Sequence, residues 1–265
     1  MKPELFGLPA YFLLWGAAAL CGSLAASRLA RRDGFPAGKS LAAIVVLVLA
    51  ILAGSKLLYL LEHVVFPVDD PGSLVSDPAA VLLWHGFRIP GGILLLAPVL
   101  PLVCRALGLP VRRFADAVLP AVGIGIIFIR LGCFLNGCCF GKVSNVLWAI
   151  AFPRGSRAYA WQLKQGLIAW PATHSLPVQP LQIYFALIGL ALYGLGRYWQ
   201  EHKEYDGHVW VNSYLLFFGS TFLLEFVRGY SLHLNFIVTA AVFVVTAAVA
   251  VRGRRMIPML GLAMP

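Results

Sequence analysis

Long apolar runs recur along the whole 265-residue chain and constrain its fold more than any other feature. A helix that crosses a bilayer needs about 20 mostly apolar residues, and the sequence offers about seven such segments. They are Leu8–Ala30, Leu41–Leu61, Pro90–Leu107, Phe114–Leu135, Leu181–Trp199, Val209–Val227 and Asn235–Val251. Because 60% of the residues are hydrophobic and 12% are charged, lipid is the expected solvent for most of the surface. The sequence therefore predicts an all-α membrane protein, a polytopic bundle of about seven transmembrane helices.

The placement of Lys and Arg between these segments indicates how the chain crosses the membrane. Basic residues gather after the first, third and fifth segments and in the C-terminal tail, whereas the second connection carries acidic residues such as Asp69 and Asp70. Positive residues favour the cytoplasmic side, so we expect the N-terminus outside and the C-terminus in the cytoplasm. The first segment lacks the cleavage pattern of a signal peptide and is expected to remain as a helix. Pro98 and Pro101 predict a kinked or partly re-entrant third segment.

The connection from Asn136 to Pro180 lies outside in this topology and is rich in Trp, Gly and Pro. Amphipathic aromatic rings suit the headgroup level of a bilayer. We expect a small irregular external cap over residues 136–180, within a single membrane domain that spans residues 1–265. The net charge of +10 arises mostly from residues that flank the apolar segments, which favours an anionic membrane face over nucleic acid as the partner.

Ionisable residues within the apolar segments stand out, because each costs about 2.5–3.5 kcal/mol on insertion scales and usually has a function. Apart from the arginines near the basic cytoplasmic ends of their segments, they are Lys56, Asp116, Arg130 and Glu225, with Arg228 just past the end of the sixth segment. In the predicted topology Arg130 and Glu225 lie near the outer ends of their helices, where they can meet. One interpretation is an ion pair that only fixes the helix ends. The other is an anion site at the outer leaflet, because arginine presents a fork of donors suited to phosphate.

The run from Arg130 to Gly141 is the most distinctive in the chain and spells Arg-Leu-Gly-Cys-Phe-Leu-Asn-Gly-Cys-Cys-Phe-Gly. Its glycines allow close approach of a ligand or another helix, and its asparagine must find a partner if it is buried. A metal site at Cys133, Cys138 and Cys139 would lack a fourth ligand and would use adjacent cysteines in one tetrahedron. Small packing residues or a disulfide are favoured instead, and no metal is expected.

The same run resembles the signature of the prolipoprotein diacylglyceryl transferase family, which is roughly Gly-Arg-x-Gly-Asn/Cys-Phe-x-Asn-Gly followed by Tyr/Phe-Gly. Further matches lie along nearly the whole chain. They are Tyr11, Ala115–Asp116, Pro120, Trp148, Phe152–Pro153, Pro180–Tyr184 and Glu225–Arg228. The chain is identified by this resemblance as a divergent member of that family.

The resemblance implies transfer of the diacylglyceryl group of phosphatidylglycerol to the lipobox cysteine of an exported prolipoprotein, in the bacterial inner membrane and without a cofactor. The expected partners are phosphatidylglycerol, other membrane lipids and the prolipoprotein signal peptide. Arg130 would hold the phosphate and stabilise charge on the leaving group, and Glu225 would orient Arg130 or its partner. Substrate-binding roles are expected for Tyr11, Asp116, Asn136, Gly141, Gln182, Tyr184 and Arg228.

Several positions depart from the family's pattern. Pro90 stands where the family has a functional histidine, and His85 is either its replacement in catalysis or an interfacial loop residue. Thr221 stands where the family has an arginine, and Gln179 and Phe185 replace a histidine and a glutamate. These departures keep two alternatives open. One is a related transferase that uses another acceptor, and the other is a lipid-binding membrane protein without catalytic activity.

Overall fold

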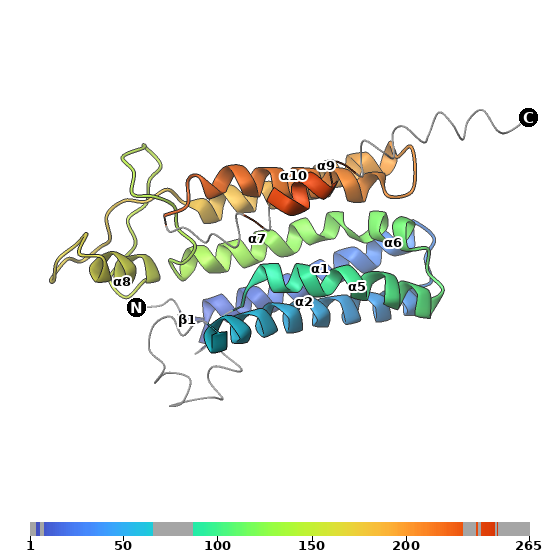
Figure 1. The fold of residues 1–265 in the computed structure, drawn as a ribbon, viewed down its shortest axis with the longest axis horizontal. Helices are drawn as coiled ribbons and strands as arrows, with labels where there is room; N and C mark the ends of the chain where they lie inside the picture. The colour runs from blue at the N-terminus through green and yellow to red at the C-terminus, as the bar shows by residue number, and fades with distance from the viewer. Residues whose placement is uncertain are drawn as a thin grey trace, which may run out of the picture. The chain divides into compact units, whose positions relative to one another are not determined.

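The computed structural model describes residues 4–5, 8–65, 87–229, 237, 240–246 and 248, and most of these residues are helical. The helices are α1 (Ala10–Arg32), α2 (Ala37–Val65), α5 (Ile89–Leu107), α6 (Val111–Val118), α7 (Pro120–Leu135), α8 (Arg157–Lys164), α9 (Leu181–Glu201) and α10 (His208–Glu225) (Figure 1). The strands β1 (Glu4–Leu5) and β2 (Leu8–Pro9) form a short antiparallel pair. The predicted segments that the structure describes fully are helical over most of their length, which confirms the helical class of the protein.

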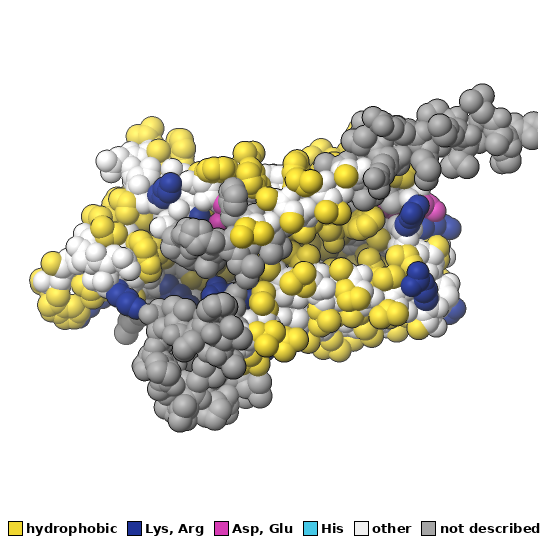
Figure 2. All heavy atoms as spheres, viewed as in Figure 1, with side chains coloured by type: hydrophobic (Ala, Val, Ile, Leu, Met, Phe, Trp, Pro, Cys, Tyr) yellow, Lys and Arg dark blue, Asp and Glu magenta, His cyan; other side chains and the backbone are white. Residues whose placement is uncertain are grey.

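Three described helices, α1, α2 and α5, are long and apolar enough to cross a membrane, and the number is four if the bent pair of α6 and α7 is counted as one span. The chain is therefore a multi-pass membrane protein. Apolar side chains cover the sides of the helices, and Lys and Arg side chains gather near their ends (Figure 2). Helices α9 and α10 have 21 and 18 residues but carry more polar side chains. The segment Asn235–Val251 falls largely outside the described residues, so the count of seven crossings stays a prediction.

Prolines act differently in the third and fourth predicted segments. The fourth was expected as one helix, but it breaks between α6 and α7 with a bend of 43°. Pro120 opens α7 at its first position, where a missing N–H is tolerated and where the ring would obstruct a continuing helix. Pro98 and Pro101 instead lie inside α5, which continues to Leu107. The continuous helix contradicts the partly re-entrant form of the prediction, because a membrane helix can absorb such prolines, and the kinked form stays a prediction.

The chain divides into two compact units, residues 30–114 and the remainder. In the first of these, α2 and α5 pack through small residues. A Cβ atom on Gly54 or on Gly91 would overlap the carbonyl oxygen of the other, and one on Gly92 would lie 2.6 Å from the Ser55 hydroxyl. The glycines that follow Pro90 thus serve close packing of helices, as is common in membranes.

In the other unit, α7 packs against α9, and α9 packs against α10 (Figure 1). The contact between α7 and α9 also rests on glycine. A Cβ atom on Gly123 would overlap the Gly189 carbonyl oxygen, and one on Gly189 would lie 2.8 Å from the Gly123 carbonyl oxygen. This close approach fixes the position of α7 against the start and middle of α9.

Gly189→Ala is expected to destabilise the protein by about 1–3 kcal/mol, because the added methyl group meets backbone that cannot move aside. Gly194→Ala is the matched control in the same helix, since nothing lies within 4 Å of its Cβ position. The control should leave stability unchanged or raise it by up to about 1 kcal/mol. Unfolding of the detergent-purified variants, followed by circular dichroism, measures both. Equal stabilities for the two variants would contradict the close packing of α7 and α9.

The segment predicted as a cap, residues 136–180, has an apolar core of its own. It consists of Phe140, Phe152, Ala158 and Val178, with Phe134, Ile150 and Trp161 packed against it. Helix α8 and its loops lie beyond one end of α7 and α9 (Figure 1). The segment is therefore a small folded region, and its position outside the membrane stays a prediction.

Candidate functional site

Three segments that lie far apart in the sequence meet just beyond the C-terminal end of α7. The Gly141 N–H donates to the Gln179 carbonyl at 2.8 Å, and the Lys142 N–H donates to the Val227 carbonyl at 2.8 Å. A Cβ atom on Gly141 would lie 2.8 Å from a Leu181 methyl carbon, so only glycine fits there. Gly141 therefore joins the distinctive run to the start of α9 and the end of α10. The geometry supports a packing role for this residue, and its predicted contact with substrate stays a prediction.

Arg130 lies in the second half of α7 and is 8% exposed. Its guanidinium carbon lies 4.1 Å from the centre of the Phe185 ring, a cation–π contact. Within the described part of the chain, no carboxylate pairs with it and no hydrogen bond reaches it. A buried cation is unfavourable without a counter-charge. This arrangement is therefore suited to an anion that arrives from outside the protein.

Glu225 and Arg228 form a bidentate ion pair at the end of α10. The Nε and Nη2 atoms of Arg228 each donate to a carboxylate oxygen of Glu225 at 2.7 Å. The two side chains are 5% and 7% exposed for Glu225 and Arg228, respectively. The prediction that Glu225 meets Arg130 is wrong, because Arg228, just beyond the end of α10, occupies its carboxylate. Glu225 therefore does not pair with Arg130.

The three cysteines of the run come together. The sulfur atoms of Cys133, Cys138 and Cys139 all lie within 4.8 Å of one another. Hydrogen bonds from the thiols of Cys133 and Cys138, with the nearby guanidinium groups of Arg130 and Arg228, hold the pKa of the Cys139 thiol well below its usual range. All five cysteines of the chain are free. The sequence analysis treated these residues as packing or disulfide residues and did not anticipate the cluster.

Three predicted substrate-binding residues border this cluster. Gln182 is fully buried, and its side-chain amide donates to the Cys138 carbonyl at 2.6 Å. Asn136 ends α7 and is half-buried beside Cys138. Tyr11 of α1 packs against Gly132, and the thiols are among the electrostatic neighbours of its hydroxyl. The structure thus gathers Tyr11, Asn136 and Gln182 into one polar site with Arg130.

A family model described as prolipoprotein diacylglyceryl transferase matches residues 4–253. The chain belongs to the prolipoprotein diacylglyceryl transferase family. Relatives carry the name phosphatidylglycerol–prolipoprotein diacylglyceryl transferase. That of Clostridium tetani is 28% identical over 237 residues, which cover 86% of each chain. A relative from Clostridium perfringens, whose name ends in the number 2, is 27% identical over 229 residues. These residues cover 85% of this chain and 82% of the relative. That of Bordetella avium is 29% identical over 185 residues, 68% and 61% of the two chains.

Two departures from the transferase family's pattern have a clear place in the structure. Phe185, where the family has a glutamate, provides the ring on which Arg130 rests. Thr221, where the family has an arginine, is buried and donates to the Phe217 carbonyl of its own helix at 2.7 Å. Thr221 therefore brings no charge to the site. His85, the third residue predicted to be catalytic, lies outside the described residues.

Tyr184 matches a transferase-family motif but contacts the neighbouring segment. Its hydroxyl accepts a hydrogen bond from the Trp148 indole at 2.6 Å and donates to the Gln179 side chain at 3.4 Å. These contacts tie α9 to the segment 136–180. They support a positioning role for Tyr184, at the edge of the site that contains Gln182.

Asp116 also matches the transferase-family pattern, yet it lies about 20 Å from Arg130 along α6 and α7. Its carboxylate is fully buried and accepts from the backbone N–H groups of Gly207 and Trp210 at 2.7 and 2.8 Å. Both bonds lie at the N-terminus of α10, where an acidic side chain satisfies free donors and favours the helix dipole. This geometry supports a structural role and gives no support to the predicted contact with substrate.

Asp116→Ala is expected to lower the free energy of unfolding by about 1–3 kcal/mol, because it removes two charge-assisted hydrogen bonds from buried donors. Asp206→Ala is the control, since Asp206 is exposed and lies 4.0 Å from the Lys203 ammonium. The control should change stability by less than about 1 kcal/mol. Denaturant unfolding of the purified proteins compares the two. A harmless Asp116→Ala substitution would contradict the capping role.

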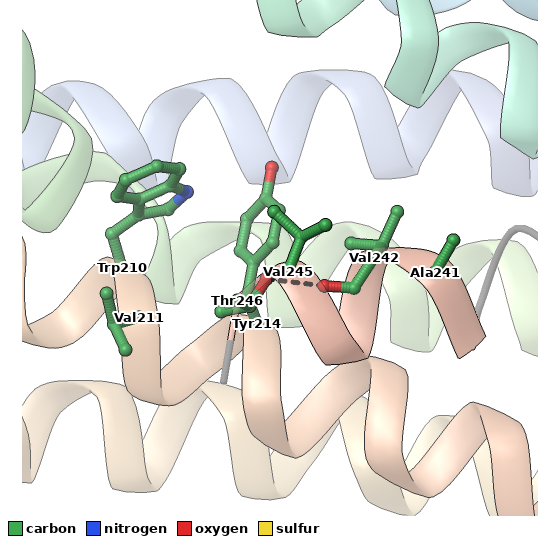
Figure 3. Close-up of a pocket in the computed structure, with 7 residues that line it drawn as sticks. All are labelled: Trp210, Val211, Tyr214, Ala241, Val242, Val245 and Thr246. Carbon is green, nitrogen blue, oxygen red and sulfur yellow. Dashed lines mark hydrogen bonds between the residues drawn. The ribbon is translucent and has the colours of Figure 1, made fainter. Parts of the chain in front are cut away.

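An apolar groove of about 280 Å³ lies away from this site (Figure 3). It is lined by Trp210, Val211, Tyr214, Ala241, Val242, Val245 and Thr246. The rings of Trp210 and Tyr214 point to the same side of α10 (Figure 3). Trp210 is about 22 Å from Glu225 along this helix, so the groove is separate from the arginine and thiol groups near the end of α7.

Proposed function

We propose that this chain transfers the diacylglyceryl group of phosphatidylglycerol to the thiol of the lipobox cysteine of exported prolipoproteins. One observation carries the proposal: Arg130 is a buried guanidinium without a carboxylate partner in the described part of the chain. An arginine in this state is suited to a phosphodiester. Family membership and the names of the relatives support the same activity.

The reaction forms a carbon–sulfur bond and breaks a carbon–oxygen bond. The thiolate attacks the glyceryl carbon that carries the phosphate ester, and the electron pair leaves with the ester oxygen as glycerol phosphate. Arg130 stabilises the negative charge that grows on this leaving group. The Nε and one Nη atom of Arg228 are occupied by Glu225, so Arg228 contributes positive potential next to Cys139. Glu225 thus acts as a positioning residue for Arg228.

The remaining roles follow from the same geometry. Tyr11, Asn136 and Gln182 border the thiols and the guanidinium group, where they hydrogen-bond the lipid headgroup or the acceptor peptide. His85 accepts the proton of the acceptor thiol. The chain lies in the bacterial inner membrane, crosses it about seven times and keeps its N-terminus and the segment 136–180 outside. This orientation brings Arg130 to the depth of the outer phosphate layer, where the signal peptide of an exported protein also arrives.

The test is complementation of a bacterium depleted of its own transferase. Expression of this chain should restore growth, and mass spectrometry should find the diacylglyceryl thioether on lipoprotein cysteines. No rescue and no thioether at normal expression in the membrane would contradict the proposal.

A second candidate is a related transferase with another acceptor. It is favoured by Thr221, whose hydroxyl is bound within its own helix and cannot replace the family's arginine. Lipid and envelope analysis of a deletion strain separates the two: loss of a diacylglyceryl-modified product other than lipoprotein favours the second. A lipid-binding protein without activity is the remaining alternative, and turnover of phosphatidylglycerol would exclude it.

A further inference from the structure

The cysteine cluster has nearly the dimensions of a metal site. Cys133 lies in the last turn of α7, and Cys138 and Cys139 follow the helix end. The three sulfur atoms lie within 4.8 Å of one another. Zinc–sulfur bonds of about 2.3 Å place sulfur ligands about 4 Å apart. Binding an ion therefore requires the side chains to close by less than about 1 Å.

The backbone holds these sulfur atoms together without an ion. The Cys138 N–H donates to the Cys133 carbonyl at 3.1 Å, and Gly137 turns the chain with φ +62°. The Cys138 carbonyl accepts from the buried Gln182 amide at 2.6 Å. Cys139 has φ +58°, the left-handed conformation that few residues other than glycine adopt. Surroundings that enforce such a conformation often mark a functional site, and here they allow adjacent cysteines to join one cluster.

The surrounding charge suits a zinc ion with several thiolates. Zinc bound to three thiolates carries a net charge of −1, and a fourth thiolate would bring it to −2. Arg130 and Arg228 are both electrostatic neighbours of Cys139. Because Glu225 neutralises Arg228, Arg130 provides the positive charge that balances a zinc ion bound to three thiolates.

The three cysteines provide three of the four ligands that a zinc ion needs. Among the described residues, no histidine or carboxylate joins the three sulfur atoms. Zinc is tetrahedral, and catalytic zinc sites have three protein ligands with the fourth position open. Soft sulfur ligands select zinc or copper(I). Zinc fits a site that must admit a fourth sulfur, and it undergoes no redox chemistry.

We propose that Cys133, Cys138 and Cys139 bind a zinc ion whose open position receives the acceptor thiol. This inference rests on the proposed function, because it assigns that reaction its means of activating the nucleophile. A thiol that coordinates zinc loses its proton more readily, and the proton passes to His85, the base of the proposed function. The zinc-bound sulfur then attacks the glyceryl carbon, and the carbon–oxygen bond breaks towards the phosphate at Arg130. The neutral thioether is a weaker ligand than a thiolate and leaves the ion.

The first experiment measures the metal and not the activity. The full chain is purified under reducing conditions, and its zinc content and zinc X-ray absorption are determined. We expect about one zinc per chain with three sulfur ligands at about 2.3 Å, and four after addition of a peptide that contains a lipobox cysteine. Cys133→Ser, Cys138→Ser and Cys139→Ser should each lower the zinc content, whereas the controls Cys21→Ser and Cys104→Ser should retain it. Absent zinc, copper(I) in its place, or equal zinc in Cys133→Ser and Cys104→Ser would overturn the proposal.

The second experiment separates this inference from the proposed function. Chelation of zinc from the wild-type protein, with the helical content checked by circular dichroism, should lower thioether formation at pH 7 by about 30-fold, since a free thiol of pKa about 8.5 is then about 3% ionised. Raising the pH towards 8.5 should recover the lost activity, and added zinc should restore it at pH 7. Full turnover without zinc would overturn the inference and leave the function intact. Zinc with four sulfur ligands but no thioether product would overturn the function and leave the metal site intact.

Discussion

Arg130→Ala is expected to lower diacylglyceryl transfer by about 10²–10³-fold, the usual effect of removing one group that stabilises charge in the transition state. The guanidinium is buried against Phe185 and lacks a carboxylate partner among the residues described, so a bound phosphate is its expected counter-ion. Turnover of phosphatidylglycerol and a lipobox peptide in detergent micelles measures the effect. Arg130→Lys should recover activity only in part, because lysine keeps the charge and loses the planar fork of donors.

Stability and a control distinguish this role from a structural one. Arg130→Ala removes a buried charge that no acid among the described residues compensates, so the unfolding free energy should stay the same or rise. Arg112→Ala replaces an exposed arginine and should leave turnover unchanged. If Arg130→Ala transferred lipid as fast as Arg112→Ala, the phosphate-binding role would have to be abandoned.

Glu225→Gln is expected to destabilise the protein by about 3–5 kcal/mol, because it leaves the Arg228 cation buried without its partner. The two side chains are only 5% and 7% exposed, and both carboxylate oxygens are used. Thermal and denaturant unfolding of the purified variant measure the loss. The double variant Glu225→Leu with Arg228→Met should regain most of the stability, since an apolar pair can replace a buried ion pair.

Glu201→Gln is the matched control for this prediction. Glu201 lies 3.5 Å from Arg197 near the end of α9, but its side chain is 65% exposed. An exposed pair of this kind contributes about 0–1 kcal/mol. Equal effects of Glu225→Gln and Glu201→Gln would show that the pair in α10 is effectively solvated.

The positions of the helices follow from the sequence to within a few residues, because the width of a bilayer sets the length of each apolar run. The predicted segment Leu181–Trp199 and the helix α9 begin at the same residue. The break at Pro120 was missed and the effect of Pro98 was overestimated, since a proline breaks a helix only where its surroundings leave the freed carbonyl groups without partners.

The sequence predicted which residues belong to the candidate site, but not which of them contact each other. Arg130 follows from a charge within an apolar run, whereas its contact with Phe185 depends on the packing of α7 against α9. The pairing of Glu225 with Arg228 was missed because α10 ends at Glu225, and the turn that follows brings Arg228 back to the carboxylate. The thiol cluster depends on a left-handed residue at position 139, and hydrophobic periodicity carries no information on such a conformation.

The main-chain bonds that join Gly141 to Gln179, and Lys142 to Val227, have an evolutionary consequence. Peptide groups, rather than particular side chains, keep the ends of α7, α9 and α10 in register. Neighbouring side chains can therefore drift, as Gln179 and Phe185 have done, while the cation at position 130 keeps its place. A backbone held in this way allows side chains that set lipid or peptide preference to change while the catalytic groups keep their positions. Strongly diverged sequences can therefore have the same fold.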